Sequence, residues 1–100
     1  MRFDFYTPSE VTQILGERLK KRRLIQNLTQ TELAYRAGLG VSTIARIESG
    51  QGGSLDNVIK IAIGLGLINK FAELFDVPPE NIKAVMAQQA LRQRASSKAL

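Results

Sequence analysis

The pattern of polar and apolar positions between residues 28 and 50 predicts two short helices separated by a glycine turn. Thr29 and Glu32 have the spacing of a capping box, in which a hydroxyl and a carboxylate satisfy each other's free backbone N–H groups. This places the start of the first helix at Gln30. Gly38 then fits the left-handed position that ends a helix, because glycine adopts a positive φ without steric penalty.

Apolar positions divide each of these helices into a buried face and a free face. The first helix carries Leu33, Ala34 and Ala37 at helical spacing, and the second carries Ile44 and Ile47. The remaining faces of the second helix hold small and donor-bearing side chains, namely Val41, Ser42, Ala45, Arg46 and Ser49. Such a surface suits a DNA major groove, so the pattern indicates a helix-turn-helix reader of DNA.

A longer helix is predicted upstream. Thr7 to Glu10 is a helix start with Pro8 at its first position, and apolar spacing then continues to about Ile25. Basic residues gather near its end: Arg18, Lys20, Lys21, Arg22 and Arg23. They complement the negative end of the helix dipole, but five cations within six positions exceed what a helix end needs. The cluster therefore also suggests contact with phosphates.

The segment after Gly50 is the most apolar of the chain. A helix is expected to start near Ser54, and the apolar run from Ile61 to Ile68 is interrupted only by two glycines. A further helix is expected from Asn69 to Phe75. One small domain cannot bury all of this surface, so part of it is expected to form a dimer or partner interface, with core packing as the alternative. The residues assigned to that interface are Leu67, Ile68, Phe71 and Phe75.

The two ends of the chain have different patterns. Pro78 and Pro79 predict a break followed by a new helix, and the polar, alanine-rich end predicts a flexible tail. Residues 2–6 alternate charged and aromatic side chains, which predicts an extended arm. This arm either pairs as a strand with a second subunit or folds onto the first helix. The expected organisation is an arm at 1–7, a DNA-binding domain at 8–76, and a C-terminal helix with a tail at 77–100.

Composition narrows the function classes. Lys and Arg outnumber Asp and Glu by 14 to 9, for a net charge of +5. This suits a polyanion binder, although a merely basic surface gives the same count. Without cysteine or histidine the chain lacks the usual metal ligands and general bases, so neither an enzyme nor a cofactor is expected. No signal pattern or membrane-length apolar run is present, so a cytoplasmic bacterial protein, nucleoid-associated when DNA-bound, is expected.

Two motifs resemble a known family. Thr29–Gly38 matches Thr-Gln-x-x-Leu-Ala-x-x-x-Gly, and Ser42–Gly50 matches Ser-Thr-Ile-x-x-Ile-Glu-x-Gly, with Leu-Gly-Glu-Arg-Leu-Lys upstream at Leu15–Lys20. These residues resemble the Cro/cI-type, or xenobiotic-response-element, helix-turn-helix regulators over roughly Ile14 to Phe75. The resemblance implies an all-α fold, a five- to six-helix lambda-repressor-like DNA-binding domain preceded here by the short extended arm.

The resemblance also assigns roles to positions. Base reading falls to Val41, Ser42, Ala45 and Arg46, with the Arg46 fork suited to guanine O6 and N7. Contacts to the DNA backbone fall to Lys20, Arg22, Thr29, Gln30, Thr43, Ser49 and Gln51. Arg23 is expected to pair with Glu48 and brace the first helix against the recognition helix. The sequence departs from the family at Gly40, a weaker cap than the usual Ser or Thr, and at Arg22, where an apolar residue is usual.

Function follows from the resemblance as a set of expectations. A symmetric dimer would place two recognition helices in successive major grooves, roughly 34 Å apart, and read an inverted repeat in double-stranded DNA. The chain is therefore expected to be a homodimeric repressor that regulates its own operon. The block Ser54–Leu67 and the ending Arg92–Ser96 look like small regulators that accompany high-persistence (Hip) type kinase toxins, which implies an antitoxin with a kinase-like toxin partner. The alternatives are a stand-alone or phage-type repressor and a protein adaptor on the same fold.

Overall fold

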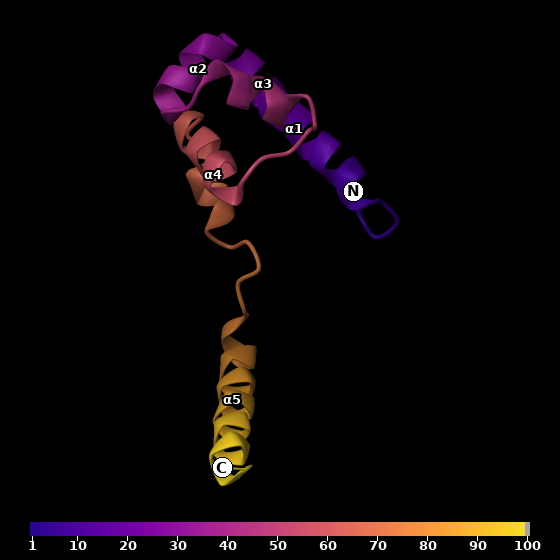
Figure 1. The fold of residues 1–100 in the computed structure, drawn as a ribbon, viewed down its shortest axis with the longest axis vertical. Helices are drawn as coiled ribbons and strands as arrows, with labels where there is room; N and C mark the ends of the chain where they lie inside the picture. The colour runs from indigo at the N-terminus through magenta and orange to yellow at the C-terminus, as the bar shows by residue number, and fades with distance from the viewer. Residues whose placement is uncertain (100) are drawn as a thin grey trace.

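The fold is a chain of helices, and Figure 1 shows their order in space. The structure is a computed structural model that describes the backbone of residues 1–99 and the side chains of residues 1–94. Its elements are α1 (Pro8–Ile25), α2 (Gln30–Ala37), α3 (Val41–Glu48), α4 (Leu55–Gly64), the 3₁₀ helix η1 (Ile68–Phe71) and α5 (Pro79–Ala99). The described residues contain no strand, so the predicted all-α class is confirmed.

Helix starts are fixed by local hydrogen bonds. Thr7 and Thr29 begin α1 and α2, and each forms a complete capping box with the glutamate three residues on, Glu10 and Glu32. Ser54 caps α4 through its hydroxyl. These starts lie where the sequence predicts them, because a cap depends only on residues within one turn.

The core lies where α2, α3 and α4 meet. Leu33, Ile44 and Ile61, one from each helix, are its largest fully buried side chains. Helix α1 joins this core from the side by packing on α3. The contact is made at Gly16, where a Cβ atom would collide with the carbonyl oxygen of Ile47. Only a glycine allows the two helices to approach this closely.

The N-terminal arm folds back onto α1, which is one of the two arrangements considered for it. The Tyr6 N–H donates to the Phe3 carbonyl at 3.0 Å and closes a turn. Phe3 is held beneath the Arg18 guanidinium, which lies 5.5 Å from the ring centroid, a cation–π contact. Arg18 also lies 3.1 Å from the Met1 sulfur. The arm therefore forms a turn that packs on α1, and it does not adopt the extended conformation that the sequence predicts.

The helix predicted from Asn69 to Phe75 is not an α-helix, and this expectation is wrong. The chain forms the 3₁₀ helix η1 and then turns, with each hydrogen bond reaching back three residues, as from the Leu74 N–H to the Phe71 carbonyl at 3.2 Å. Phe75 has a φ of +61°, which takes the chain off any right-handed helical path. A stretch this short needs packing on both sides to stay α-helical, and here one side remains open.

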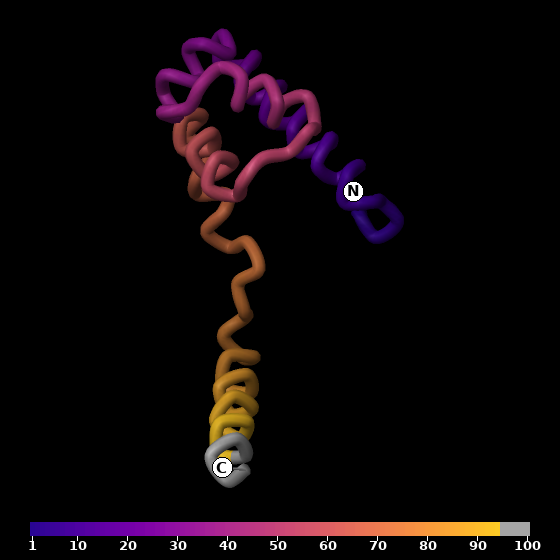
Figure 2. The backbone as a smooth tube through the Cα atoms, in the orientation of Figure 1, coloured from indigo at the N-terminus to yellow at the C-terminus, as the bar shows by residue number. Residues whose placement is uncertain are grey.

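Helix α5 projects away from the other helices, as Figures 1 and 2 show. The described side chains from 79 to 94 are exposed, and the molecule measures 57 × 31 × 29 Å as a result. The chain is helical through Ala99, over the stretch for which the sequence predicts a flexible tail, and Leu100 lies outside the described residues. Among the described helices, none is long and apolar enough to span a membrane.

Candidate nucleic-acid interface

Helices α2 and α3 form a tight pair. Gly38 ends α2 in the left-handed conformation, with φ +69°, and the Leu39 N–H returns to the Ala34 carbonyl at 2.9 Å. Helix α3 then starts after Gly40, which makes no side-chain cap bond. Because Ile44 and Ile47 are buried on the inner side, the outer side of α3 is fixed toward solvent.

The outer side of α3 carries the residues predicted to read bases. At about 100° per residue, positions 41, 42, 45 and 46 fall within one arc opposite the buried isoleucines. Val41, Ser42 and Arg46 are exposed and Ala45 is half-buried. Within the described part of the chain, the Arg46 guanidinium makes no hydrogen bond or ion pair, so its donor fork is unoccupied.

Residues predicted to contact the DNA backbone are distributed around this arc. Thr29 accepts from the Glu32 N–H and is committed to the α2 cap. Ser49 and Gln51 are exposed at the C-terminal end of α3, whereas Thr43 is half-buried. The Ser49 hydroxyl donates to the Arg46 carbonyl at 3.0 Å, which keeps its oxygen lone pairs available to a donor.

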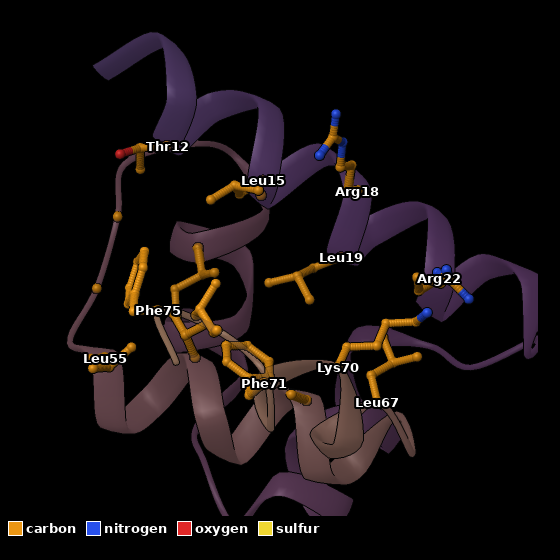
Figure 3. A pocket seen from close by; sticks show the side chains of 17 residues that line it. Thr12, Leu15, Arg18, Leu19, Arg22, Leu55, Leu67, Lys70, Phe71 and Phe75 are labelled. Atoms are coloured by element: carbon orange, nitrogen blue, oxygen red, sulfur yellow. The ribbon is translucent and has the colours of Figure 1, made fainter. Parts of the chain in front are cut away.

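The two basic residues predicted from α1 lie on different sides of that helix. Positions 20 and 22 are about 200° apart around the axis. Arg22 lines an apolar groove on the side of α1 that faces η1, as Figure 3 shows, and Arg18 lies along the same rim. Lys20 is therefore turned away from the groove. The two predicted phosphate contacts on α1 therefore start from opposite sides of the helix.

A buried ion pair holds α1, α2 and α3 together. Arg23 Nε donates to Glu48 Oε2 at 2.7 Å and Arg23 Nη2 donates to Glu48 Oε1 at 2.9 Å. Both residues are only 6% exposed. Arg23 Nη1 donates further to the Leu28 carbonyl at 2.7 Å. The hydrogen bond with Glu48 raises the pKa of the Arg23 guanidinium, so the arginine stays charged at every physiological pH.

The structure adds one partner that the sequence reasoning missed. Gln30 Nε2 donates to Glu48 Oε1 at 3.1 Å, which anchors the first residue of α2 to the last residue of α3. The family resemblance assigns Gln30 to the DNA backbone alone. No local pattern could reveal the bond, because the two residues are brought together by the α2–α3 turn.

Three of the four residues predicted to form an interface, Leu67, Phe71 and Phe75, line the same groove, and Ile68 does not. Leu67 and Phe71 are half-buried, Ile68 is 38% exposed and Phe75 is 92% exposed. They lie away from the arc of α3 that carries the base-reading candidates. The two predicted surfaces are therefore separate.

A family model described as helix-turn-helix matches residues 19–69, just over half of the chain. The chain belongs to the Cro/cI-type helix-turn-helix family. It is thus a DNA-binding transcription regulator. The match runs from within α1 into η1 and covers the whole α2–α3 pair and the Arg23–Glu48 ion pair. The arm, the first part of α1 and α5 lie outside the matched region.

Proposed function

We propose that this helix-turn-helix regulator is a sequence-specific repressor that binds an inverted-repeat operator as a homodimer and regulates its own operon. The observation that carries the proposal is the outer arc of α3. It presents exposed small side chains around the free fork of Arg46, on a helix whose inner side is fully buried. A rigid helix with an unoccupied donor face is what the major groove requires.

Within the arc, each side chain suits a different feature of a base pair. Arg46 donates both arms of its fork to guanine O6 and N7, and Val41 packs against a thymine methyl group. Ser42 supplies a hydroxyl that can donate or accept, and Ala45 keeps the centre of the arc low enough for close approach. Arg46 therefore carries most of the discrimination.

Backbone contacts align the arc with the DNA. The N-terminal end of α2, at Thr29 and Gln30, offers the backbone N–H of Gln30, because the Thr29 N–H already donates to Glu32 within the cap. Gln51 follows the C-terminal end of α3. Lys20 is the cation on α1 best placed to join them, because Arg22 faces the groove. Ser49, at the C-terminal end of α3, and Thr43, beside the arc, complete the set. These contacts supply affinity, and the net charge of +5 strengthens it at low salt.

The proposal is tested by fluorescence anisotropy of the protein with its own upstream DNA and with a scrambled duplex of equal length, across a salt series. We expect strong preference for the upstream duplex, with affinity for both falling as salt rises. Equal and steeply salt-dependent binding to both duplexes would contradict a sequence-specific repressor. Failure to bind either duplex would favour the adaptor on the same fold.

A second candidate function is that of a Hip-type antitoxin with a kinase-like toxin as its partner. It is supported by the resemblance of residues 54–67 and Arg92–Ser96 to such regulators, and by the amount of exposed surface on α5. The side chains of that ending beyond Arg94 lie outside the described residues. Co-purification with the product of an adjacent kinase-like gene would support this function. Absence of such a gene would favour the stand-alone or phage-type repressor.

A further inference from the structure

An apolar groove runs between α1 on one side and α4 with η1 on the other. Its volume is about 780 Å³, and its walls include Leu15, Leu19, Val58, Leu67, Phe71 and Phe75 (Figure 3). Helix α1 packs mainly on α3 and α4 mainly on α2, which leaves the facing sides of α1 and α4 apart. Leu15 is consequently 45% exposed. The groove is an extension of the core that nothing in the described chain covers.

Helix α5 carries an apolar stripe on which nothing in the described chain packs. Ile82, Val85 and Met86 fall within an arc of about 100° on this helix. All three are exposed, as are the other described residues of α5. An isolated helix is marginal in water, and an exposed apolar stripe favours association. Both surfaces therefore need a partner of the same apolar character.

The linker leads α5 away from the groove of its own chain. Val77 and Pro78 both precede a proline, and a residue before proline is held in an extended conformation. The chain between η1 and α5 therefore continues outward instead of reversing, as the tube in Figure 2 shows. A stiff proline hinge that holds an element away from its own domain favours exchange of that element between two chains.

We infer that α5 of a second copy fills the groove, and that the two copies exchange these helices around a twofold axis. The inference rests on the proposed homodimer and deepens it by naming its interface. Charge permits this docking. The two turns that carry the stripe contain one acidic residue, Glu80, and one basic residue, Lys83, both off the stripe, whereas Arg92 and Arg94 lie farther along α5. In the exchanged dimer the basic residues Arg22 and Lys70, which line the groove, would therefore face a stretch of helix with no net charge.

The first test compares two aspartate substitutions on α5 by sedimentation equilibrium. Val85→Asp places a charge on the stripe, and Leu91→Asp makes the same kind of change on the opposite side of the helix. Both residues are exposed within one chain, so neither change disturbs the fold, which circular dichroism checks. We expect Val85→Asp to weaken dimerisation by about tenfold or more and Leu91→Asp to leave it unchanged. Equal effects, or a monomeric unmodified protein, would overturn the inference.

The second test asks which chain supplies the helix. The protein has no cysteine, so Leu15→Cys and Val85→Cys can be purified separately, mixed and treated with a short bismaleimide. We expect a crosslinked dimer that joins one variant to the other. A control protein carries both Leu15→Cys and Val85→Cys in one chain. Crosslinking only within single chains of that protein, or no crosslinking at all, would overturn the exchange.

The two proposals fail separately. A dimer that reads its operator but is unaffected by Val85→Asp would refute the helix exchange alone. A dimer that depends on Val85 but shows no preference for upstream DNA would refute the proposed repressor alone.

Discussion

Arg23 and Glu48 are charged residues in a place where charges are costly. Removing two charges from water carries a penalty that only close geometry and further hydrogen bonds offset. Here the pair forms two hydrogen bonds, and the Leu28 carbonyl and Gln30 amide satisfy more of the remaining donors and acceptors. The pair therefore sets the positions of α1, α2 and α3 more than it adds net stability.

Replacing Glu48 with alanine is expected to destabilise the protein by about 3–5 kcal/mol, because the buried Arg23 charge loses its partner. Urea unfolding followed by circular dichroism measures the change. The matched control is Glu17→Ala, which removes an exposed carboxylate 3.8 Å from Lys21 and is expected to cost less than about 1 kcal/mol. Similar losses for the two variants would show that the buried pair does not hold the helices together.

Lys20 and Arg22 differ by two positions and yet are expected to behave differently. Lys20→Ala should weaken binding to every DNA sequence alike and reduce the slope of log affinity against log salt by about 1, because one phosphate contact is lost. Arg22→Ala removes the same charge from the groove side and should leave the slope nearly unchanged. Salt titrations of both variants on one duplex make the comparison. A larger loss of slope for Arg22→Ala would reverse the assignment.

At the scale of elements, the α1–α3 contact depends on one missing side chain. Gly16→Ala would force a methyl group against the Ile47 carbonyl, and overpacking of this kind costs about 1–3 kcal/mol. Gly40→Ser is the contrasting change. Its nearest neighbour lies 3.9 Å from the new Cβ, and a serine N-cap should stabilise α3 by a few tenths of a kcal/mol. The melting temperature should therefore fall for Gly16→Ala and rise slightly for Gly40→Ser. An unchanged melting temperature for Gly16→Ala would contradict the close packing of α1 on α3.

The cap of α2 makes its stability depend on pH. Two hydrogen bonds lower the pKa of the Glu32 carboxyl below its ordinary 4.5. The larger effect comes from the Thr29 backbone N–H and the smaller from the Thr29 hydroxyl. A lowered carboxyl pKa stabilises the fold above the unfolded value, and that stabilisation disappears as the pH falls through the folded value. Glu32→Gln should thus lower the melting temperature at pH 7 but not in strong acid. Glu73→Gln, at an exposed position, is the control, and a pH-independent difference would contradict the cap.

The sequence predicts an element well when the interactions that form it lie within a few residues of each other. The starts of α1, α2 and α4 follow from caps one turn long, and Thr7, Thr29 and Ser54 mark them. The helix expected at Asn69–Phe75 fails because its spacing assumes packing that one chain does not provide. Apolar spacing alone does not show whether a segment has another element to pack against.

Within the candidate interface, the same distinction separates what the sequence predicts from what it misses. Arg23 and Glu48, which the family resemblance pairs, are hydrogen-bonded in the structure. The bond from Gln30 to Glu48 was missed because it depends on how the α2–α3 turn places two residues distant in the chain. Lys20 and Arg22 look alike in the sequence, and only the packing of α1 separates their directions.

At the scale of the whole molecule, two surfaces serve different purposes. The outer arc of α3 is polar and small, and it lies within the region matched to the helix-turn-helix family. The groove and the stripe on α5 are apolar and lie partly beyond that region. In the account proposed above, the first surface reads DNA and the second joins two copies, so that two arcs face the same side of the duplex.

The measurement that tests the central claim most directly is the specificity ratio, the affinity for upstream DNA divided by that for scrambled DNA, of the unmodified protein and of Arg46→Ala. Arg36→Ala, an exposed arginine on α2, controls for loss of charge. We predict that Arg46→Ala costs ~1–3 kcal/mol on upstream DNA and much less on scrambled DNA, so that the ratio collapses while Arg36→Ala preserves it. Equal losses on both duplexes for Arg46→Ala would show that α3 does not read the sequence through this residue.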